Sequence, residues 1–442
     1  MKNWKNWRHG RLPKGKPAGH SNMKAKKTGR YDSAPLITLL FCLLYFTSYM
    51  TRKSFGAVKL GLPETLLTDA EIGYIGSALF FTYGAGQIVS GLLGDRIDPR
   101  KLILCGLAAT MVCNAAFPFV TSVPLLILLW AVNGFAQALF WPPIVKLMTI
   151  YLSGDRYTRA VMAVSIAAQA ALLAVYAAAA LFVSFSAWQG MFALSCGFAV
   201  LTGICLVLGF RTLEHRHPGK VLAALTTKET TEAPSLSTRK PSKRLWPAVL
   251  ASGLLVLIII TALVGFLRDG IEEWMSTYLY DTFSLAADLS TLMNLFMPVF
   301  GMVCVRLVAV LHLRILRNET REVALLMGIC AAALLCLAIF HTLHPIFSLV
   351  MIVLAIGCIQ ATNTSLTCYV PARFAKSGKV STVSGLVNAF TYVGSTIATS
   401  LIPLLFGTAG WGTTILSWGA VALCGLTLAL LVAKRWKGFI QE

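Results

Sequence analysis

The chain has 442 residues, of which 57% are hydrophobic and only 13% are charged. Soluble domains carry about 25% charged residues, so this composition excludes an ordinary soluble protein and indicates a polytopic membrane protein. The formal net charge of +20 would suit a nucleic-acid partner. The basic residues, however, cluster in short connections between apolar runs, as in the inner loops of membrane proteins, and we expect no nucleic acid.

A polar and basic arm, 1–33, precedes the first apolar run. It has no short apolar stretch followed by a small-residue cleavage site, so it does not look like a cleaved signal peptide. The arm suits two roles, which are binding of a partner or RNA and contact with anionic lipids of the inner leaflet. We favour the lipids, because basic segments beside a membrane are attracted to its negative surface.

Apolar runs of about 20 residues, each long enough to cross a bilayer, predict twelve transmembrane helices. The polar stretch 211–245 divides them and is interpreted as a cytoplasmic linker, part of which can form an amphipathic surface helix. The fold class is therefore an all-α membrane protein with two six-helix bundles, 34–210 and 246–433, and a tail, 434–442. The first six helices are expected at about 34–57, 72–94, 101–120, 124–150, 160–184 and 188–210, and the second six at about 246–268, 283–311, 322–341, 345–364, 381–407 and 411–433.

The distribution of charge predicts the orientation of these helices. If the chain starts inside, most of its 38 lysines and arginines fall in cytoplasmic connections, and Lys59 is the clear case on the outer side. Both termini are therefore expected in the cytoplasm. The eleven cysteines contain no CxxC pair and are interpreted as small apolar residues, so we expect neither a metal site nor a cofactor.

Two arginines lie in or at the end of apolar runs, and they are close to half the chain length apart. Arg52 is in the first run and Arg268 ends the seventh. An arginine in a bilayer is costly and usually marks a substrate path, and one per half is what a duplicated transporter would carry. The alternative is that Arg52 reaches the outer headgroups and that Arg268 pairs with a nearby carboxylate at the surface. If both face a cavity, the two guanidinium groups suit a tetrahedral dianion.

Acidic residues are expected only in loops or at helix ends. Proton-coupled carriers usually need a buried titratable group, and the best candidates for gating or coupling here are Asp269 and Glu273. This scarcity favours exchange of one anion for another over proton symport. Lys53 follows Arg52 but points roughly 100° away around the helix, so we do not expect it to share the same ligand.

The loop between the second and third predicted helices reads Gly91-Leu-Leu-Gly94-Asp95-Arg96, followed by a basic pair. It resembles the signature loop of the major facilitator superfamily, in which Asp and Arg latch helix ends on the cytoplasmic side. An ordinary basic turn is the alternative for Asp95 and Arg96. The matching region after the eighth helix, at Val305-Arg306, lacks the aspartate, so a second latch is not expected.

Several motifs resemble those of the organophosphate:phosphate antiporter family, whose familiar members are bacterial glycerol-3-phosphate and hexose-phosphate transporters. The resemblance runs through all twelve predicted helices, and the paired arginines are its most specific element. The motifs are Tyr49-Met-Thr-Arg52-Lys53-Ser-Phe55, Phe81-Thr-Tyr83-Gly84, Trp141-Pro142-Pro143, Leu267-Arg268-Asp269-Gly270-Ile271-Glu272-Glu273-Trp274, Ser384-Gly385 and Tyr392-Val393-Gly394.

The resemblance implies that phosphate or a phosphate monoester binds between the two halves. Arg52 and Arg268 match the essential arginines of the first and seventh helices, and Tyr49 and Tyr392 match tyrosines that line the same cavity. Trp141 and its prolines match a helix-four motif that we interpret as a kink. A monomer is expected by the same resemblance.

Two positions depart from the glycerol-3-phosphate transporter pattern. Gln87 stands where that pattern has a lysine, and Gln169 stands where it has a histidine. Glutamines can hydrogen-bond but cannot be charged, so a less charged or bulkier anion would fit. Close packing of the alanine-rich fifth helix is the alternative explanation for the neighbouring changes.

The sequence therefore predicts a secondary transporter of the bacterial inner membrane that exchanges a phosphate ester for inorganic phosphate by alternating access. Two unpaired cations in a closed cavity would repel each other, so the empty carrier would turn over reluctantly. The alternatives are a membrane sensor of a sugar phosphate and a proton-coupled carrier of a less charged solute. An enzyme is not expected, because the apolar segments contain neither a nucleophile–base pair nor a metal cluster.

Overall fold

The computed structural model describes residues 33–63, 65–94, 97–152, 155–226, 252–314, 318–374 and 380–441. The basic arm up to residue 32, the two loop residues Asp95 and Arg96, and residues 227–251, which comprise the end of the predicted linker and the start of the predicted seventh helix, lie outside the described residues. Their predicted roles therefore stay predictions.

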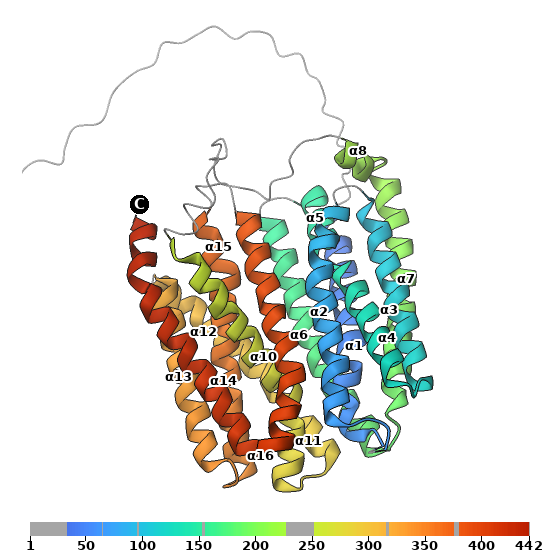
Figure 1. Ribbon diagram of the computed structural model, residues 1–442. Coiled ribbons are helices and arrows are strands. Elements are labelled where there is room, and N and C mark those ends of the chain that lie inside the picture. The colour runs from blue at the N-terminus through green and yellow to red at the C-terminus, as the bar shows by residue number, and fades with distance from the viewer. Residues whose placement is uncertain are drawn as a thin grey trace, which may run out of the picture. The chain divides into compact units, whose positions relative to one another are not determined.

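The N-terminal half is built from helices, which Figure 1 shows in blue to green as a set of neighbouring rods. Two short connecting turns, η1 (Lys59–Gly61) and η2 (Phe117–Phe119), follow the first and third helices. The helices are α1 (Ala34–Val58), α2 (Asp69–Gly94), α3 (Pro99–Ala116), α4 (Val123–Ala138), α5 (Trp141–Tyr151), α6 (Asp155–Ser184), α7 (Gln189–Arg216) and the short α8 (Lys220–Thr226).

The C-terminal half is also helical, and Figure 1 shows it in yellow to red. A turn of π-helix, η3 (Ser365–Tyr369), directly follows its fourth predicted crossing, 345–364. The helices are α10 (Leu254–Phe283), α11 (Ala287–Met293), α12 (Phe296–Arg314), α13 (Glu319–Phe340), α14 (Pro345–Thr364), α15 (Val370–Ala372) and α16 (Val380–Gln441).

Ten helices of the described ranges are long and apolar enough to cross a membrane, which confirms the all-α, many-helix class. One of these stretches, in α16, is 58 residues long and contains Gly410, whose backbone leaves the helical region at φ 75° and ψ 171°. At 1.5 Å per residue, such a stretch is long enough for two crossings of a bilayer about 30 Å thick. The 26-residue α2 is not among the ten. The number twelve stays a prediction.

The kink predicted in the fourth helix is confirmed. The first segment, α4, ends at Ala138, and α5 begins at Trp141, with Pro142 and Pro143 in its first turn. Proline lacks an N–H and clashes with the preceding turn inside a helix, but it is tolerated in the first turn. The Trp-Pro-Pro motif therefore divides one predicted span into two helices.

The predicted end of the seventh helix, at residue 268, is wrong, and its predicted start at residue 246 lies outside the described residues. The helix α10 runs from Leu254 to Phe283, so Arg268 lies near its middle, and Asp269, Glu272 and Glu273 lie inside it. The expectation that every acidic residue sits in a loop or at a helix end is wrong for the same reason. Charged residues ended the apolar run in the sequence, but the helix continues because those charges have partners across the protein interior.

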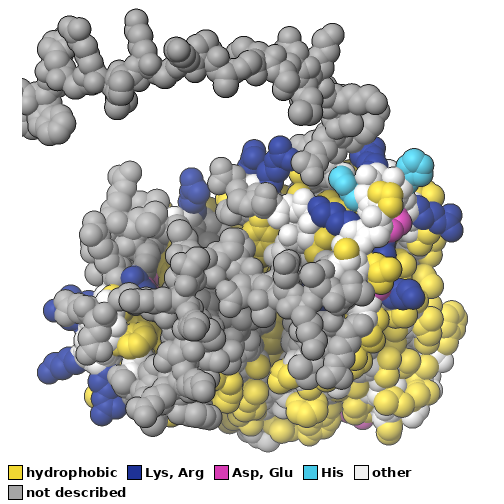
Figure 2. All heavy atoms as spheres, turned by 90° about the horizontal axis from the view of Figure 1, so that it is seen from above, with side chains coloured by type: hydrophobic (Ala, Val, Ile, Leu, Met, Phe, Trp, Pro, Cys, Tyr) yellow, Lys and Arg dark blue, Asp and Glu magenta, His cyan; other side chains and the backbone are white. Residues whose placement is uncertain are grey.

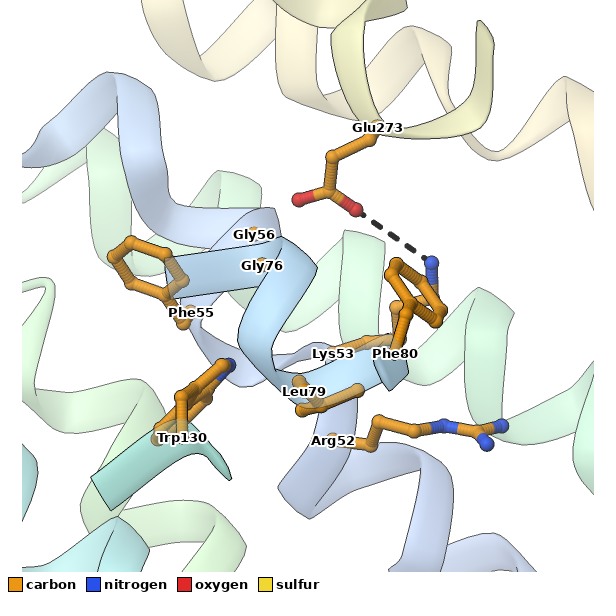
Figure 3. Close-up of a pocket in the computed structure, with 9 residues that line it drawn as sticks. All are labelled: Arg52, Lys53, Phe55, Gly56, Gly76, Leu79, Phe80, Trp130 and Glu273. Carbon is orange, nitrogen blue, oxygen red and sulfur yellow. Dashed lines mark ion pairs between the residues drawn. The ribbon is translucent and has the colours of Figure 1, made fainter. Parts of the chain in front are cut away.

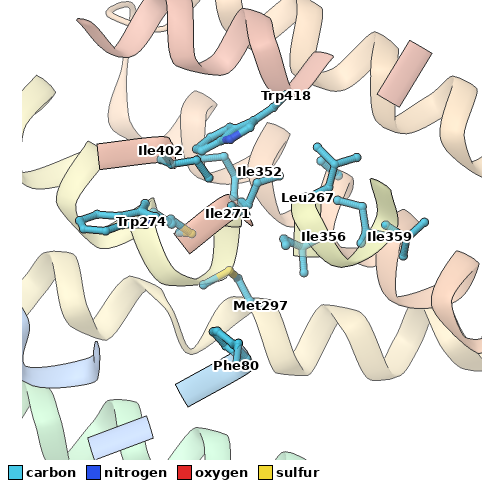
Figure 4. Packing of buried hydrophobic residues seen from close by; sticks show 14 of the residues in the cluster. Phe80, Leu267, Ile271, Trp274, Met297, Ile352, Ile356, Ile359, Ile402 and Trp418 are labelled. Carbon is cyan, nitrogen blue, oxygen red and sulfur yellow. The ribbon is translucent and has the colours of Figure 1, made fainter. Parts of the chain in front are cut away.

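Small residues allow α2 and α16 to approach closely where the two halves meet. Gly73 and Gly76 of α2 lie against Thr399 of α16, and Gly84 lies against Tyr392. The hydroxyl of Ser77 also donates to the carbonyl of Thr396 at 2.8 Å. Figure 4 shows the apolar core around α10 and includes Phe80 of α2, which packs into a cluster formed mainly by the C-terminal half.

The described part of the chain begins and ends at the same end of the helices, at the top of Figure 1. Ser33 shares a 3.0 Å hydrogen bond with His217, which joins the start of α1 to the end of α7. The indole of Trp436 donates to Glu319 at 2.9 Å and joins the end of α16 to the start of α13. Figure 2 shows lysine and arginine side chains gathered on this face. Cytoplasmic termini stay a prediction that this charge distribution supports.

The crossing of α10 and α16 gives a stability prediction. Gly394 leaves no room for a side chain, because an added Cβ would collide with the backbone carbonyl of Ala262, whereas Gly385 of the same helix has nothing within 4 Å. We expect Gly394→Ala to destabilise the protein by about 1–3 kcal/mol, since the two helices must separate. Thermal unfolding of purified protein measures this, with Gly385→Ala as the matched control. Equal melting temperatures for the two variants would contradict it.

Candidate functional site

A small cavity of about 20 Å³ lies where α1, α2 and α4 of the N-terminal half face α10 of the C-terminal half (Figure 3). It brings two cations of α1 together with one carboxylate of α10. Its other lining side chains are apolar, so the charged groups are only weakly hydrated. The lining residues are Arg52, Lys53, Phe55, Gly56, Gly76, Leu79, Phe80, Trp130 and Glu273.

Arg52 is a buried cation whose neighbours are aromatic rings. It is 9% exposed, and its guanidinium carbon lies 4.3 Å from the ring centre of Tyr49 and 5.1 Å from that of Tyr83. Aromatic faces attract a cation through their quadrupole, but they do not neutralise it. The Nε atom is buried and has no hydrogen-bond partner within the described ranges. Arg52 therefore keeps both its charge and a donor for a ligand.

Arg268 is held differently, by the carboxylate that follows it in α10. Its Nε donates to Oδ1 of Asp269 at 3.0 Å, and its Nη2 donates to Oδ2 at 2.6 Å. The same Oδ2 accepts a hydrogen bond from the hydroxyl of Ser395 in α16. The two charged side chains are 14% and 5% exposed. The predicted pairing alternative for Arg268 is thus realised, but in the protein interior instead of at the surface.

Tyr392 links the surroundings of the two arginines. Its ring lies 4.7 Å from the ring of Tyr83, which in turn faces Arg52. Tyr392 is close enough to interact electrostatically with both Arg52 and Arg268. Three of the predicted binding residues, Arg52, Tyr49 and Tyr392, are therefore neighbours directly or through the ring of Tyr83.

The two predicted glutamines are half-buried, on α2 and α6. The Nε2 of Gln87 is buried without a hydrogen-bond partner among the described residues, so it has a free donor. Among the described residues, no hydrogen bond joins Gln169 to either arginine. The predicted role of each glutamine in binding stays a prediction.

Lys53 forms the charged contact between the two halves. Its Nζ lies 3.2 Å from Oε1 of Glu272 and 3.6 Å from Oε2 of Glu273, and all three side chains are 12% exposed or less. The hydroxyl of Tyr176, in α6, also donates to Glu272 at 3.2 Å. Two elements of the N-terminal half therefore hold α10 through one pair of carboxylates.

Lys59 reinforces this contact, although the sequence suggested only an outer loop for it. It is 5% exposed, its Nζ lies 3.7 Å from the ring centre of Trp274, and it donates to the backbone carbonyl of Glu273. Sequence reasoning missed both lysines as partners of α10. The available signal was the run of three carboxylates after Arg268, which in a bilayer requires cations from elsewhere.

A buried hydrogen-bond network that the sequence reasoning also missed holds α1 in register beneath Arg52. The amide of Gln137 donates to the hydroxyls of Thr51 and Thr110, at 2.8 and 2.9 Å. The amides of Asn114 and Asn133 both donate to the carbonyl of Thr51, at 2.9 and 3.2 Å. Unpaired polar groups are costly in a dry interior, so this network specifies one alignment of α1, α3 and α4.

Comparison with known proteins decides the family. A model described as the Major Facilitator Superfamily matches residues 41–399. The chain belongs to this superfamily. The matched proteins are transporters or membrane sensors, not enzymes. Within the described ranges, no group of three His, Cys, Asp or Glu side chains is arranged to hold a metal ion.

Curated relatives of this superfamily member confirm the resemblance to organophosphate:phosphate antiporters. A probable hexose phosphate transport protein of Chlamydia trachomatis is 29% identical over 58% of this chain and 59% of that protein. A glycerol-3-phosphate transporter of Bacillus subtilis is 27% identical over 53% of this chain and 55% of that protein. The membrane sensor protein UhpC of Salmonella typhimurium is 39% identical over 26% of this chain and 27% of that protein. The chain thus spans about 59% or less of the length of these relatives.

Solved structures show the major facilitator fold. A D-xylose-proton symporter has a TM-score of 0.68 at 13% identity and covers 91% of this chain and 97% of its own. A bacterial homologue of the lysosomal transporter Spinster, in an inward-facing and occupied conformation, has a TM-score of 0.67 at 14% identity over 91% and 97%. The protein is a multi-pass membrane protein, and its bacterial relatives agree with the predicted place in the inner membrane.

The buried ion pairs of Lys53 give a second stability prediction. Lys53→Met leaves two buried carboxylates without their cation, and breaking a buried pair from one side costs about 3–5 kcal/mol. We expect a lower melting temperature that Glu272→Gln in the same chain partly restores. Lys434→Met, at an exposed position of α16, is the control. Strictly additive losses in the double variant would show that the pair does not couple the two helices.

Proposed function

We propose that this protein is a secondary transporter that carries a phosphate ester and inorganic phosphate across the membrane by alternating access. The observation that carries the proposal is a pair of interior arginines from opposite halves, Arg52 and Arg268, whose positive charges both act on one tyrosine, Tyr392. Curated relatives named as hexose phosphate and glycerol-3-phosphate transporters support the substrate class.

Arg52 is the proposed primary ligand of the phosphate group. Its buried Nε has no partner among the described residues, and its charge faces only the rings of Tyr49 and Tyr83. A guanidinium fork matches the geometry of two phosphate oxygens, and hydrogen bonds between charged groups are the strong ones. Arg268 approaches the same anion from the other half. The tyrosine hydroxyls and the free donor of Gln87 are proposed to add neutral hydrogen bonds.

Opening on the Lys59 side requires breaking contacts between the halves. These are the ion pairs of Lys53 with Glu272 and Glu273, and the contacts of Lys59 with α10. Toward the opposite end, an added Cβ would meet nothing within 4 Å at Gly91 of α2 or Gly385 of α16. We therefore infer a conformation that is closed on the Lys59 side and open toward the other end. The basic face in Figure 2 supports a cytoplasmic assignment of that end.

A membrane sensor is the second candidate, because the chain is 39% identical to UhpC over 26% of its length. A sensor needs the same binding site but no rapid transport. Binding without flux would therefore favour it, whereas flux of the bound anion favours the transporter.

Ligand-dependent thermal stability tests the binding site. A ligand that binds only the folded state stabilises it by about 2.7 kcal/mol when present at 100 times its Kd. We expect inorganic phosphate or a phosphate ester to raise the melting temperature of the parent, and Arg52→Ala and Arg268→Ala to abolish the rise.

Arg306→Ala, at an exposed position of α12, is the control variant and should respond as the parent does. An uncharged sugar is the control ligand and should have no effect. If the two interior variants respond normally to phosphate, the arginines are structural and the proposal fails.

A further inference from the structure

We infer that Asp269 is a built-in counter-anion for Arg268, which allows the empty carrier to return across the membrane and to catalyse net transport besides exchange. The inference rests on the proposed function and assigns Asp269 as a positioning residue for it. The sequence argument for obligatory exchange assumed two unpaired cations facing each other in the empty site. In the structure, Asp269 pairs with Arg268, so Arg52 is left as the one unpaired cation of the two.

The contact between Arg268 and Asp269 is built to persist without substrate. It is bidentate, with N–O distances of 3.0 and 2.6 Å, and the carboxylate is only 5% exposed. A third donor, Ser395, holds the carboxylate from α16. Parallel charge-assisted hydrogen bonds of this kind are strong, and they fix both partners in one orientation. Arg268 is therefore neutralised by a group that never leaves the protein.

All three of these side chains belong to the C-terminal half. Rocking of one half against the other leaves contacts within a half intact, so this neutralisation holds in every conformation of the carrier. The ion pairs of Lys53 with Glu272 and Glu273 behave differently, because they join α1 to α10 and break when that side opens. Asp269 thus neutralises a charge of the substrate site. Glu272 and Glu273 instead form the ion pairs that keep the two halves closed on the Lys59 side.

The charge balance around the site supports the same conclusion. Four cations, Arg52, Lys53, Lys59 and Arg268, lie near three carboxylates in the interior. Lys53 and Arg268 are paired with carboxylates, and Lys59 contacts the ring of Trp274 and the backbone carbonyl of Glu273. At the substrate site itself, Arg52 has aromatic rings in place of an acid. Closing the empty site then encloses one cation that two rings stabilise, instead of two cations that repel each other. The electrostatic barrier to the return of the empty carrier is correspondingly lower.

Substrate binding becomes a competition at Arg268. Two of its nitrogens, Nε and Nη2, already donate to Asp269, so an arriving anion takes the remaining donors or displaces the carboxylate toward Ser395. Removing the negative charge should therefore tighten anion binding and slow the empty carrier at the same time. A residue that served only to stabilise the fold would not change these two quantities in opposite directions.

The test uses the full chain in liposomes loaded with labelled inorganic phosphate, with potassium and valinomycin to clamp the membrane potential. Efflux into phosphate-free buffer measures net transport, and efflux into phosphate measures exchange. We expect the parent to show net efflux within about tenfold of exchange, a ratio that corresponds to about 1.4 kcal/mol. In Asp269→Asn we expect the net rate to fall by about tenfold or more and the KM for phosphate in exchange to decrease.

Asp281→Asn is the matched control, because it makes the same change in the same helix about 18 Å away, where Asp281 accepts a hydrogen bond from Trp411. Exchange without net efflux in the parent would overturn the inference and leave the proposed function standing. Net efflux in Asp269→Asn equal to that of the parent would also overturn it. If the parent shows neither net efflux nor exchange, both the inference and the proposed function fail. The ratio of net efflux to exchange is measured in the parent alone. The inference is therefore decided even if Asp269→Asn does not fold.

Discussion

The cost of burying charge in an apolar interior governs the architecture of this protein. Near its middle, α10 carries Arg268, Asp269, Glu272 and Glu273, and each needs a partner because unpaired ions are expensive there. Some partners come from the same half, and others cross to the opposite one. The ion pairs between α1 and α10 are therefore both a requirement of folding and a contact that joins the two halves.

The two arginines that look equivalent by symmetry have different surroundings. Arg52 lies against the rings of Tyr49 and Tyr83, whereas Arg268 is clamped by Asp269. An aromatic face leaves the charge available, and a carboxylate cancels it. The surroundings of the two arginines are thus electrostatically asymmetric, with the positive charge that has no carboxylate partner on the N-terminal half.

Rigid halves and a breakable interface follow from different kinds of contact. In the N-terminal half, amides centred on Thr51 fix α1 against α3 and α4. In the C-terminal half, Gly265 and Gly394 allow α10 and α16 to pack backbone against backbone. Neither set can rearrange without unpaired polar groups or collisions. Motion is then left to the few ion pairs and the small-residue contacts between the halves.

The helical membrane class, the superfamily and the kink at Trp141 could be predicted from the sequence, because hydropathy, loop charge and proline act locally. Arg52 and Arg268 were identifiable for the same reason, since an arginine in an apolar run stands out in one dimension. The extent of α10 and the partners of its carboxylates could not be predicted from the sequence. Lys53 and Lys59 are more than 200 residues from Glu272 and Glu273, and only the packing of α1 against α10 brings them together. The sequence by itself determined that two arginines lie in apolar segments. The tertiary structure decided which other charges join them in the interior and which of these are neutralised, because pairing depends on distances that the order of residues does not contain.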